Sequence, residues 1–201
     1  GPPQAKNMMR ELYAMGADEA IVLSDMKFSG ADTWATSNTL AALIRTLEFD
    51  LIIAGRQAID GDTAQVGPQT AEKLGLPQIT YVDDIIAVKD GKIVVKKALE
   101  STYELVEAPL PCVITTLSTL AEPRFMHVKG ISHAFEREIR TMTFDDINID
   151  PSIIGLKGSP TKVKKTFTKE VHKNSDILHL DGKSAARKVF DIMVDFKFIG
   201  K

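Results

Sequence analysis

The sequence predicts an α/β fold: a Rossmann-like parallel sheet with an antiparallel hairpin insertion and an extended C-terminal arm. Short apolar runs at 20–23, 51–54 and 112–116 have the length and composition of strands that are buried on both faces, as in parallel sheets. Segments with apolar residues at helical spacing follow the first two runs. Between the second and third runs, two extended stretches meet at Asp90-Gly91, which is a typical hairpin turn.

The same periodicities assign the remaining elements. The first half is predicted to contain, in order, helix 4–15, strand 20–23, helix 33–48, strand 51–54 and helix 64–74. The second half is predicted to contain strands 79–89, 92–99, 101–107 and 112–116, a short helix at 131–139, an extended or capping segment at 143–149, an extended linker at 153–168 and a helix at 184–198. Gly16 and Gly75 end the first and third helices, because glycine readily adopts the left-handed conformation at a helix end.

These elements suggest a domain at 1–150 and a linker with a terminal helix at 151–201. The terminal helix places apolar side chains on roughly one face: Ala185, Val189, Ile192, Met193 and Phe196. That face needs a surface to cover it, either the chain's own domain or a partner chain. The chain also opens with the loop and helix of a βαβ unit, so we expect the first strand region of that unit to be missing or to be supplied separately. The alternative is a fold that begins with a helix.

Composition excludes several classes of protein. The net charge is −2, so no global basic field is present to attract nucleic acid. The single cysteine, Cys112, excludes an intramolecular disulfide and a cysteine-cluster metal site, and the four histidines lack metal-ligand spacing. No apolar run approaches the roughly 18 residues of a membrane helix, and no signal peptide is visible. We therefore expect a cytoplasmic protein without a metal site, membrane insertion or a nucleic-acid partner.

The candidate site is the loop between the strand at 51–54 and the helix at 64–74. In a parallel sheet such a loop lies at the carboxyl ends of the strands, where open α/β folds bind ligands. The first turn of the helix has unpaired N–H groups and a positive dipole, which suit a phosphate. The residues expected to form this site are Gly55, Arg56, Gln57, Ala58, Ile59, Asp60, Gly61, Asp62, Thr63, Ala64, Gln65 and Val66.

Several of these residues suit a nucleotide. Gly55 and Gly61 let the backbone approach a ligand closely and tolerate unusual dihedral angles. Thr63 can cap the helix or donate its hydroxyl to a phosphate oxygen. Asp60 and Asp62 repel a phosphate, so we expect one to cap the turn and the other to meet a ribose hydroxyl or a backbone amide. Plain turn and cap chemistry is the alternative, because neither a GxGxxG nor a Walker lysine motif occurs here.

No catalytic centre is predicted. The sequence contains no GxSxG nucleophile elbow and no recognisable Ser/His/Asp order. The carboxylate pairs Asp83-Asp84 and Asp145-Asp146 suit strand-edge and cap positions. A nucleotide-type loop without catalytic groups indicates a carrier whose chemistry belongs to a cofactor.

The run GRQAIDGDTAQVGP at 55–68 resembles the signature loop of the electron-transfer flavoprotein beta subunit. The stretches 1–25, 30–44, 103–116 and 158–167 resemble further segments of that family, so the resemblance covers essentially the whole chain. Family members carry an additional strand–helix–strand stretch before the equivalent of the present start, about a quarter of the usual length. The missing stretch includes part of the nucleotide pocket.

The resemblance implies a carrier subunit of a heterodimer. The larger alpha subunit holds the redox-active FAD, and the arm at 151–201 packs on that subunit. The beta subunit binds AMP in simple carriers and a second FAD in electron-bifurcating ones. Electrons pass between the flavins and an acyl-CoA dehydrogenase-type partner, as in fatty acid β-oxidation.

The resemblance also implies a docking loop for this flavoenzyme partner. The docking residues are Phe125, Val128, Lys129, Ile131 and Phe135. Around Lys129 the loop is more similar to bifurcating members, in which a cation near a flavin favours its anionic reduced form. The alternative for Lys129 is a solvated loop lysine.

Two other functions stay open on the sequence alone. The first is an ATP-cleaving or adenylating enzyme of a related nucleotide-binding fold, although no Ser-Gly-Gly type pyrophosphate loop is visible. The second is a purely structural scaffold that keeps AMP as a fixed component.

Overall fold

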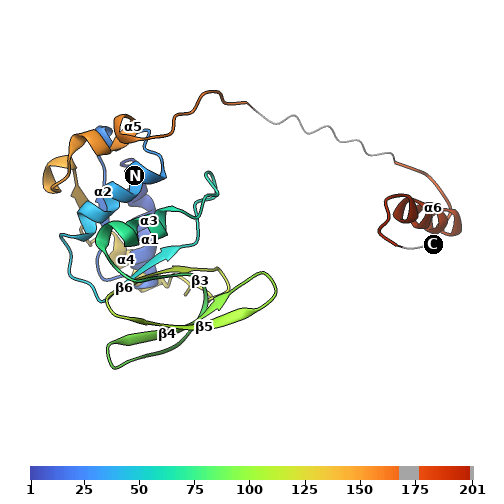
Figure 1. Ribbon diagram of the computed structural model, residues 1–201, viewed down its shortest axis with the longest axis horizontal. Helices are drawn as coiled ribbons and strands as arrows, with labels where there is room; N and C mark the ends of the chain where they lie inside the picture. Colours follow the sequence, from blue (N-terminus) through green and yellow to red (C-terminus); the bar gives the residue numbers. More distant parts are fainter. Residues whose placement is uncertain (168–176, 200–201) are drawn as a thin grey trace. The chain divides into compact units, whose positions relative to one another are not determined.

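The computed structural model describes residues 1–167 and 177–199. The chain divides into two compact units, Gly1–Lys162 and Val163–Lys201. In the first unit, helices gather on one side of a twisted set of strands, from which an antiparallel ribbon extends (Figure 1). The predicted α/β class is confirmed.

The larger sheet has five strands in the order β2 (Leu51–Gly55), β6 (Cys112–Thr116), β3 (Gln78–Lys89), β4 (Lys92–Ala98) and β5 (Tyr103–Pro109). β2, β6 and β3 run parallel, whereas β4 pairs antiparallel with β3 and β5. The predicted parallel core with an antiparallel insertion is therefore confirmed. The main hydrophobic cluster of this sheet consists of Ile79, Val82, Ile93, Val95, Ala108, Cys112 and Ile114.

A second, two-stranded parallel sheet pairs β1 (Ile21–Leu23) with β7 (Arg140–Met142). No sequence pattern predicts β7, because three residues with one buried side chain, Met142, make no apolar run. The segment expected at 143–149 to be extended or capping contains a 3-10 turn at Phe144–Asp146 with a capping box, which matches the capping alternative. Among the described strands, β2 pairs only with β6, and its Ile53 is 58% exposed.

Two helices flank the candidate loop. Helix α2 (Thr33–Ile44) packs on α3 (Val66–Leu74). Helix α2 ends four residues earlier than predicted, because Thr46 turns the chain there: both its amide and its hydroxyl donate to the carbonyl of Leu43. Helix α3 begins two residues later than predicted, because Ala64 has a φ of 53°, in the left-handed region.

On another side of the unit, α1 (Ala5–Met15) packs on α4 (Val128–Ala134). The helix predicted at 131–139 thus begins and ends earlier, because His127 caps it: Nδ1 accepts a 2.8 Å hydrogen bond from the amide of Gly130. A Cβ at Gly130 would lie 2.6 Å from the carbonyl oxygen of Ala14, so glycine at this position allows the two helices to approach closely.

The residues that follow are folded onto the first unit. The predicted extended linker is wrong for 155–158, which form the short helix α5 (Gly155–Gly158) after a 3-10 turn at Pro151–Ile153. The sequence suggested a linker because the stretch is rich in Gly, Pro and Lys. Ile154, which is 2% exposed, and Ser159, which is 5% exposed, fix it to the body instead.

The second unit contains α6 (Gly182–Asp195), which confirms the predicted terminal helix. Asp181 caps it by accepting hydrogen bonds from the amides of Lys183 and Ser184. Within this unit, the apolar side chains of Val189 and Phe196 are 56% and 71% exposed. Across the described residues, no helix has both the length and the apolar composition needed to cross a membrane.

Candidate functional site

The candidate loop lies at the carboxyl end of β2, as predicted. Gly55 is in register with Thr116 of the parallel strand β6, and the amide of Arg56 donates a 3.1 Å hydrogen bond to the carbonyl of Thr116. The chain then leaves the sheet and returns at the first turn of α3. The loop therefore projects from the sheet edge at which α/β folds place their ligands.

The loop forms one wall of a cavity of about 490 Å³. Nine of the twelve predicted residues line it: Arg56, Gln57, Ala58, Asp60, Gly61, Thr63, Ala64, Gln65 and Val66. The other three do not. Gly55 lies at the end of the strand, Asp62 forms hydrogen bonds within the loop, and Ile59 is fully exposed.

Sequence reasoning missed the opposite wall of this cavity. That wall is formed by the start of α2 and by the chain after α5, and the residues it adds are Ala31, Asp32, Thr33, Thr36 and Thr161; Gly67 of α3 is a further lining residue. The sequence did contain a signal for Asp32. This residue lies in a loop between a parallel strand and a helix, which is also the position of the candidate loop. No local pattern marks Thr161, which approaches from far along the chain.

Side chains hold the loop in place at both ends. The hydroxyl of Thr33 donates a 2.9 Å hydrogen bond to Oε1 of Gln65, which ties α2 to the start of α3. Nε2 of Gln57 donates to Oδ1 of Asp62 within the loop. Of the two roles that the sequence allowed for Thr63, the helix cap is not formed, because the N-cap residue is Gln65, and Gln65 makes no side-chain capping bond. The first turn of α3 thus has no side-chain cap.

The unusual backbone angles of the loop belong to other residues than expected. Asp62 and Ala64 have φ values of 50° and 53°, whereas Gly55 and Gly61 do not adopt positive φ. The tolerance of these two glycines for unusual dihedral angles is therefore not used as a positive φ in this structure. A Cβ at either glycine would meet nothing within 4 Å, so both positions face open space.

Charge is unevenly distributed around the cavity. Among its described lining residues, Arg56 carries the only basic side chain, and the acidic ones are Asp32 and Asp60. Partial burial raises the pKa of Asp32, but hydrogen bonds from Ala35 and Thr161 outweigh this effect and leave the pKa lowered. The cavity wall therefore carries one positively charged side chain, Arg56, and two carboxylates, Asp32 and Asp60. The start of α3, which also lines the cavity, has no side-chain cap.

The five predicted docking residues lie on an exposed surface. Phe125, Val128 and Phe135 are 96%, 85% and 71% exposed, and Ile131 lines a cavity of about 340 Å³ between α1 and α4. The guanidinium of Arg10 lies 5.3 Å from the centre of the Phe135 ring. Lys129, on α4, is exposed and does not line the 490 Å³ cavity.

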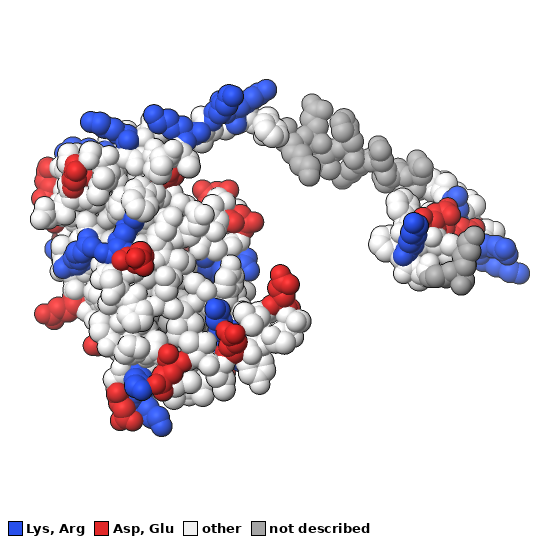
Figure 2. Space-filling view, in the orientation of Figure 1, with Lys and Arg blue, Asp and Glu red and all other residues white. Residues whose placement is uncertain are grey.

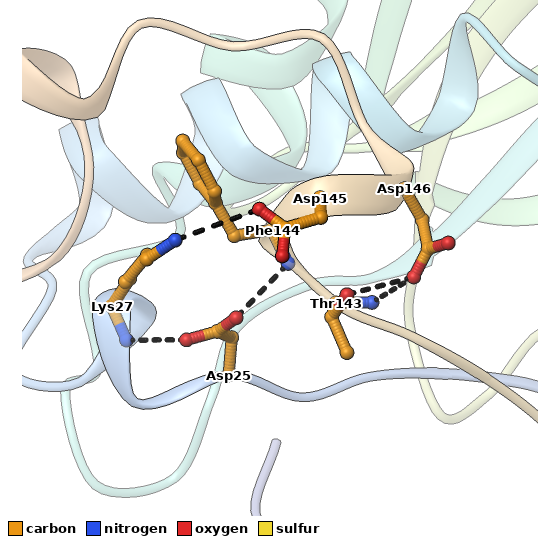
Figure 3. Close-up of polar contacts among 6 residues, drawn as sticks. All are labelled: Asp25, Lys27, Thr143, Phe144, Asp145 and Asp146. Atoms are coloured by element: carbon orange, nitrogen blue, oxygen red, sulfur yellow. Dashed lines mark hydrogen bonds and ion pairs between the residues drawn. The ribbon is translucent and has the colours of Figure 1, made fainter.

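A separate polar cluster joins the ends of β1 and β7 (Figure 3). Asp25 accepts hydrogen bonds from the amides of Lys27, at 2.9 Å, and Phe144, at 3.1 Å. These amide hydrogen bonds lower the pKa of Asp25. Nζ of Lys27 lies 3.6 Å from Oδ1 of Asp145. The cluster consists of backbone caps and an ion pair, so its role is to fix the two strand ends.

Comparison with known proteins extends these observations. Residues 1–147 match the family described as the electron transfer flavoprotein domain. The electron transfer flavoprotein subunit beta of Clostridium acetobutylicum is 50% identical over 199 residues, which cover 99% of this chain and 76% of that protein. CarD, a subunit of the caffeyl-CoA reductase-Etf complex of Acetobacterium woodii, is 52% identical over 169 residues, covering 84% of this chain and 64% of that protein.

A further relative carries a related name. The acryloyl-CoA reductase electron transfer subunit gamma of Anaerotignum propionicum is 46% identical over 177 residues, covering 84% of this chain and 66% of that protein. The chain thus spans between 64% and 76% of the length of these three relatives. The resemblance expected from the sequence is confirmed. The chain belongs to the electron transfer flavoprotein family, among its beta subunits, and is an electron-transfer subunit rather than an adenylating enzyme.

Proposed function

We propose that this chain holds an adenine nucleotide, AMP or FAD, in the cavity beside the 55–66 loop. The observation that carries the proposal is the combination of that loop, at the carboxyl end of β2, with a cavity of about 490 Å³. This volume lies in the range of roughly 300–1,000 Å³ that is typical of small-molecule sites.

The chemistry of the wall suggests how such a ligand is oriented. The phosphate suits the first turn of α3, because the helix lacks a side-chain cap and its N–H groups and dipole attract an anion. Arg56 adds a positive charge on the same loop. Asp60 repels a phosphate and suits the hydroxyl groups of a ribose, which can donate to a carboxylate.

The chain itself contributes binding and orientation. When bound, a flavin would supply the redox chemistry, as cofactors do in carriers of this kind. The described chain also shows no cluster of metal ligands. AMP in the same cavity acts as a fixed structural group.

We propose that the exposed surface around α4, which carries the five predicted docking residues, docks the flavoenzyme partner. Phe125, Val128 and Phe135 are exposed aromatic and aliphatic side chains, and such side chains act as anchors in interfaces. Two relatives are named for reductases of CoA esters, caffeyl-CoA and acryloyl-CoA. We accordingly assign the partner to flavoenzymes of CoA esters, of the acyl-CoA dehydrogenase type.

We propose that the C-terminal arm, within 151–201, packs on an alpha subunit. The exposed apolar side chains of α6 support this, since a helix of this kind gains stability by covering its apolar face. Basic side chains also follow α5 along the chain, and Lys162, Lys164 and Lys165 are all exposed (Figure 2). These lysines suit an acidic surface on the partner.

Coexpression with an alpha subunit tests this function. We expect a stable heterodimer with a flavin absorption spectrum, whose flavin is reduced by an acyl-CoA dehydrogenase-type enzyme and its substrate. A colourless chain that does not associate would contradict the proposal. Incubation of the heterodimer with excess FAD then distinguishes the two nucleotides, because exchange of bound AMP for FAD indicates a second flavin site.

A further inference from the structure

Asp32 connects three parts of the first unit. Its Oδ1 accepts a 3.1 Å hydrogen bond from the amide of Ala35 and so caps α2. Its Oδ2 accepts hydrogen bonds from both the amide of Thr161, at 3.0 Å, and the hydroxyl of Thr161, at 2.8 Å. Its own amide donates a 2.8 Å hydrogen bond to Oγ of Ser159.

Ser159, which accepts the hydrogen bond from the amide of Asp32, is itself held in place. The hydroxyl of Ser159 lies 2.8 Å from the carbonyl oxygen of Gly155 and donates to it, and Ser159 is 5% exposed. The first unit ends at Lys162, one residue beyond Thr161. Residues 159–162 are therefore the root of the C-terminal arm, and Asp32 fastens this root to the N-terminus of α2.

The same residues form part of the cavity wall. Asp32 and Thr161 both line the 490 Å³ cavity, opposite the loop that carries Arg56 and Gly61. A ligand that contacts both walls favours the arrangement in which Thr161 is bonded to Asp32. By linkage, the bonded arrangement favours the ligand by the same factor.

We propose that Asp32 is a positioning residue that couples occupancy of the loop cavity to the fastening of the arm root. The inference rests on the proposed function, because the ligand is the adenine nucleotide assigned to this cavity. An occupied cavity then holds Thr161, and with it the root of the arm, in place on the first unit. When the cavity is empty, the hydrogen bonds from Thr161 to Asp32 are weaker.

The variant Asp32→Asn separates the two roles of the carboxylate. Its amide oxygen keeps the cap of α2, because asparagine is a good N-cap residue. Its amide nitrogen cannot accept from the amide of Thr161. The matched control is Asp150→Asn, because Asp150 likewise caps a turn, accepting a 2.8 Å bond from the amide of Ser152, but does not line the cavity.

The first measurement uses the full chain without nucleotide. Hydrogen exchange at the Thr161 amide, followed by NMR, reports directly on its bond to Asp32. We expect exchange roughly tenfold faster in Asp32→Asn than in the wild type, and unchanged in Asp150→Asn. Equal exchange rates in the wild type and Asp32→Asn would overturn the fastening role.

The second measurement adds nucleotide, with AMP and FAD titrated separately against the chain in complex with an alpha subunit. We expect the bound nucleotide to slow exchange at Thr161, and Asp32→Asn to bind it roughly five- to tenfold more weakly than Asp150→Asn does. Wild-type affinity in Asp32→Asn would overturn the coupling and leave the proposed function standing. Failure of both nucleotides to bind the wild type would overturn the coupling together with the proposed function.

Discussion

Gly67 and Thr115 meet where α3 crosses the end of β6, with no room for a side chain on Gly67. A Cβ at this position would lie 2.6 Å from Cγ2 of Thr115, which is closer than side-chain carbons approach one another. Thr115 is 3% exposed and its Oγ1 accepts a hydrogen bond from the amide of Tyr81, so it is not free to move. This contact sets how closely the first turn of α3 lies against the sheet, and thereby the shape of the proposed nucleotide cavity.

Gly67→Ala is expected to destabilise the protein. Overpacking of this kind costs about 1–3 kcal/mol, which exceeds the gain of about 1 kcal/mol from replacing a helical glycine by alanine. Urea denaturation followed by circular dichroism measures the difference.

Thr115→Ser provides the matched background, because it removes Cγ2 and keeps the hydroxyl that Tyr81 uses. In that background Gly67→Ala should be neutral or stabilising. The same loss of stability in both backgrounds would show that the contact does not constrain the helix.

Ala64→Val is expected to disturb the loop more than its size suggests. Ala64 has a φ of 53°, and a β-branched residue in the left-handed region is strained beyond the roughly 1–2 kcal/mol that alanine already bears. We expect lower stability and weaker AMP binding in calorimetric titration. Ala64→Gly should keep the stability and the AMP affinity of the wild type, since glycine adopts this conformation without strain.

Ala58→Val is the control within the same loop, because Ala58 does not have a positive φ. If Ala58→Val and Ala64→Val lowered AMP affinity equally, side-chain volume rather than backbone strain would explain the effect.

Asp25→Asn is expected to lower stability in a pH-dependent way. Amide hydrogen bonds from Lys27 and Phe144 lower the pKa of Asp25 below its ordinary value of 3.8. A carboxylate whose pKa is lower in the folded than in the unfolded state stabilises the fold above the unfolded pKa. This contribution is lost as the pH falls through the folded pKa.

The pH dependence is checked by measuring the midpoint of urea denaturation for the wild type and for Asp25→Asn, at pH 7 and at pH 3. The wild type should have the higher midpoint at pH 7, and the difference should shrink at pH 3. Asp84→Asn is the control, because Asp84 is exposed and its carboxylate accepts no hydrogen bond among the described residues. A difference for Asp25→Asn that stays constant with pH would contradict the assignment.

Phe125→Ala is expected to impair docking without harming the fold. Phe125 is 96% exposed, so its removal should change the free energy of unfolding by less than about 0.5 kcal/mol. An anchor residue at an interface contributes about 1–2 kcal/mol or more, so the KM for the partner flavoenzyme should rise roughly tenfold. Dye reduction driven by the partner's substrate measures this.

Leu105→Ala is the matched control, since Leu105 is 65% exposed on β5 and is not one of the predicted docking residues. Equal KM values for the wild type and Phe125→Ala would exclude Phe125 from the docking surface.

The sequence predicted the parts of the fold that depend on local pattern. The strand at Leu51–Gly55, the following loop and the helix ending at Gly75 are consecutive, so periodicity and glycine placement were enough to identify them. The left-handed φ of Ala64 was not predictable, because alanine rarely adopts it and only the surrounding contacts impose it.

Long-range pairing was beyond the sequence. The insertion of β6 between β2 and β3, and the pairing of β7 with β1, depend on contacts between segments far apart in the chain. For the same reason the sequence yielded only one wall of the cavity. The wall that contains Asp32 and Thr161 forms through hydrogen bonds that span 129 positions.

The most direct test of the account is the identity of the nucleotide that the chain retains. The heterodimer is purified without added nucleotide and denatured, and the released small molecules are identified by mass spectrometry for the wild type and for Ala64→Val. The account predicts an adenine nucleotide, AMP or FAD, in roughly equal amount to this chain beyond the flavin held by the alpha subunit, and less of it from Ala64→Val. Release of no adenine nucleotide beyond the flavin of the alpha subunit would contradict the central claim that the 55–66 loop forms a nucleotide site.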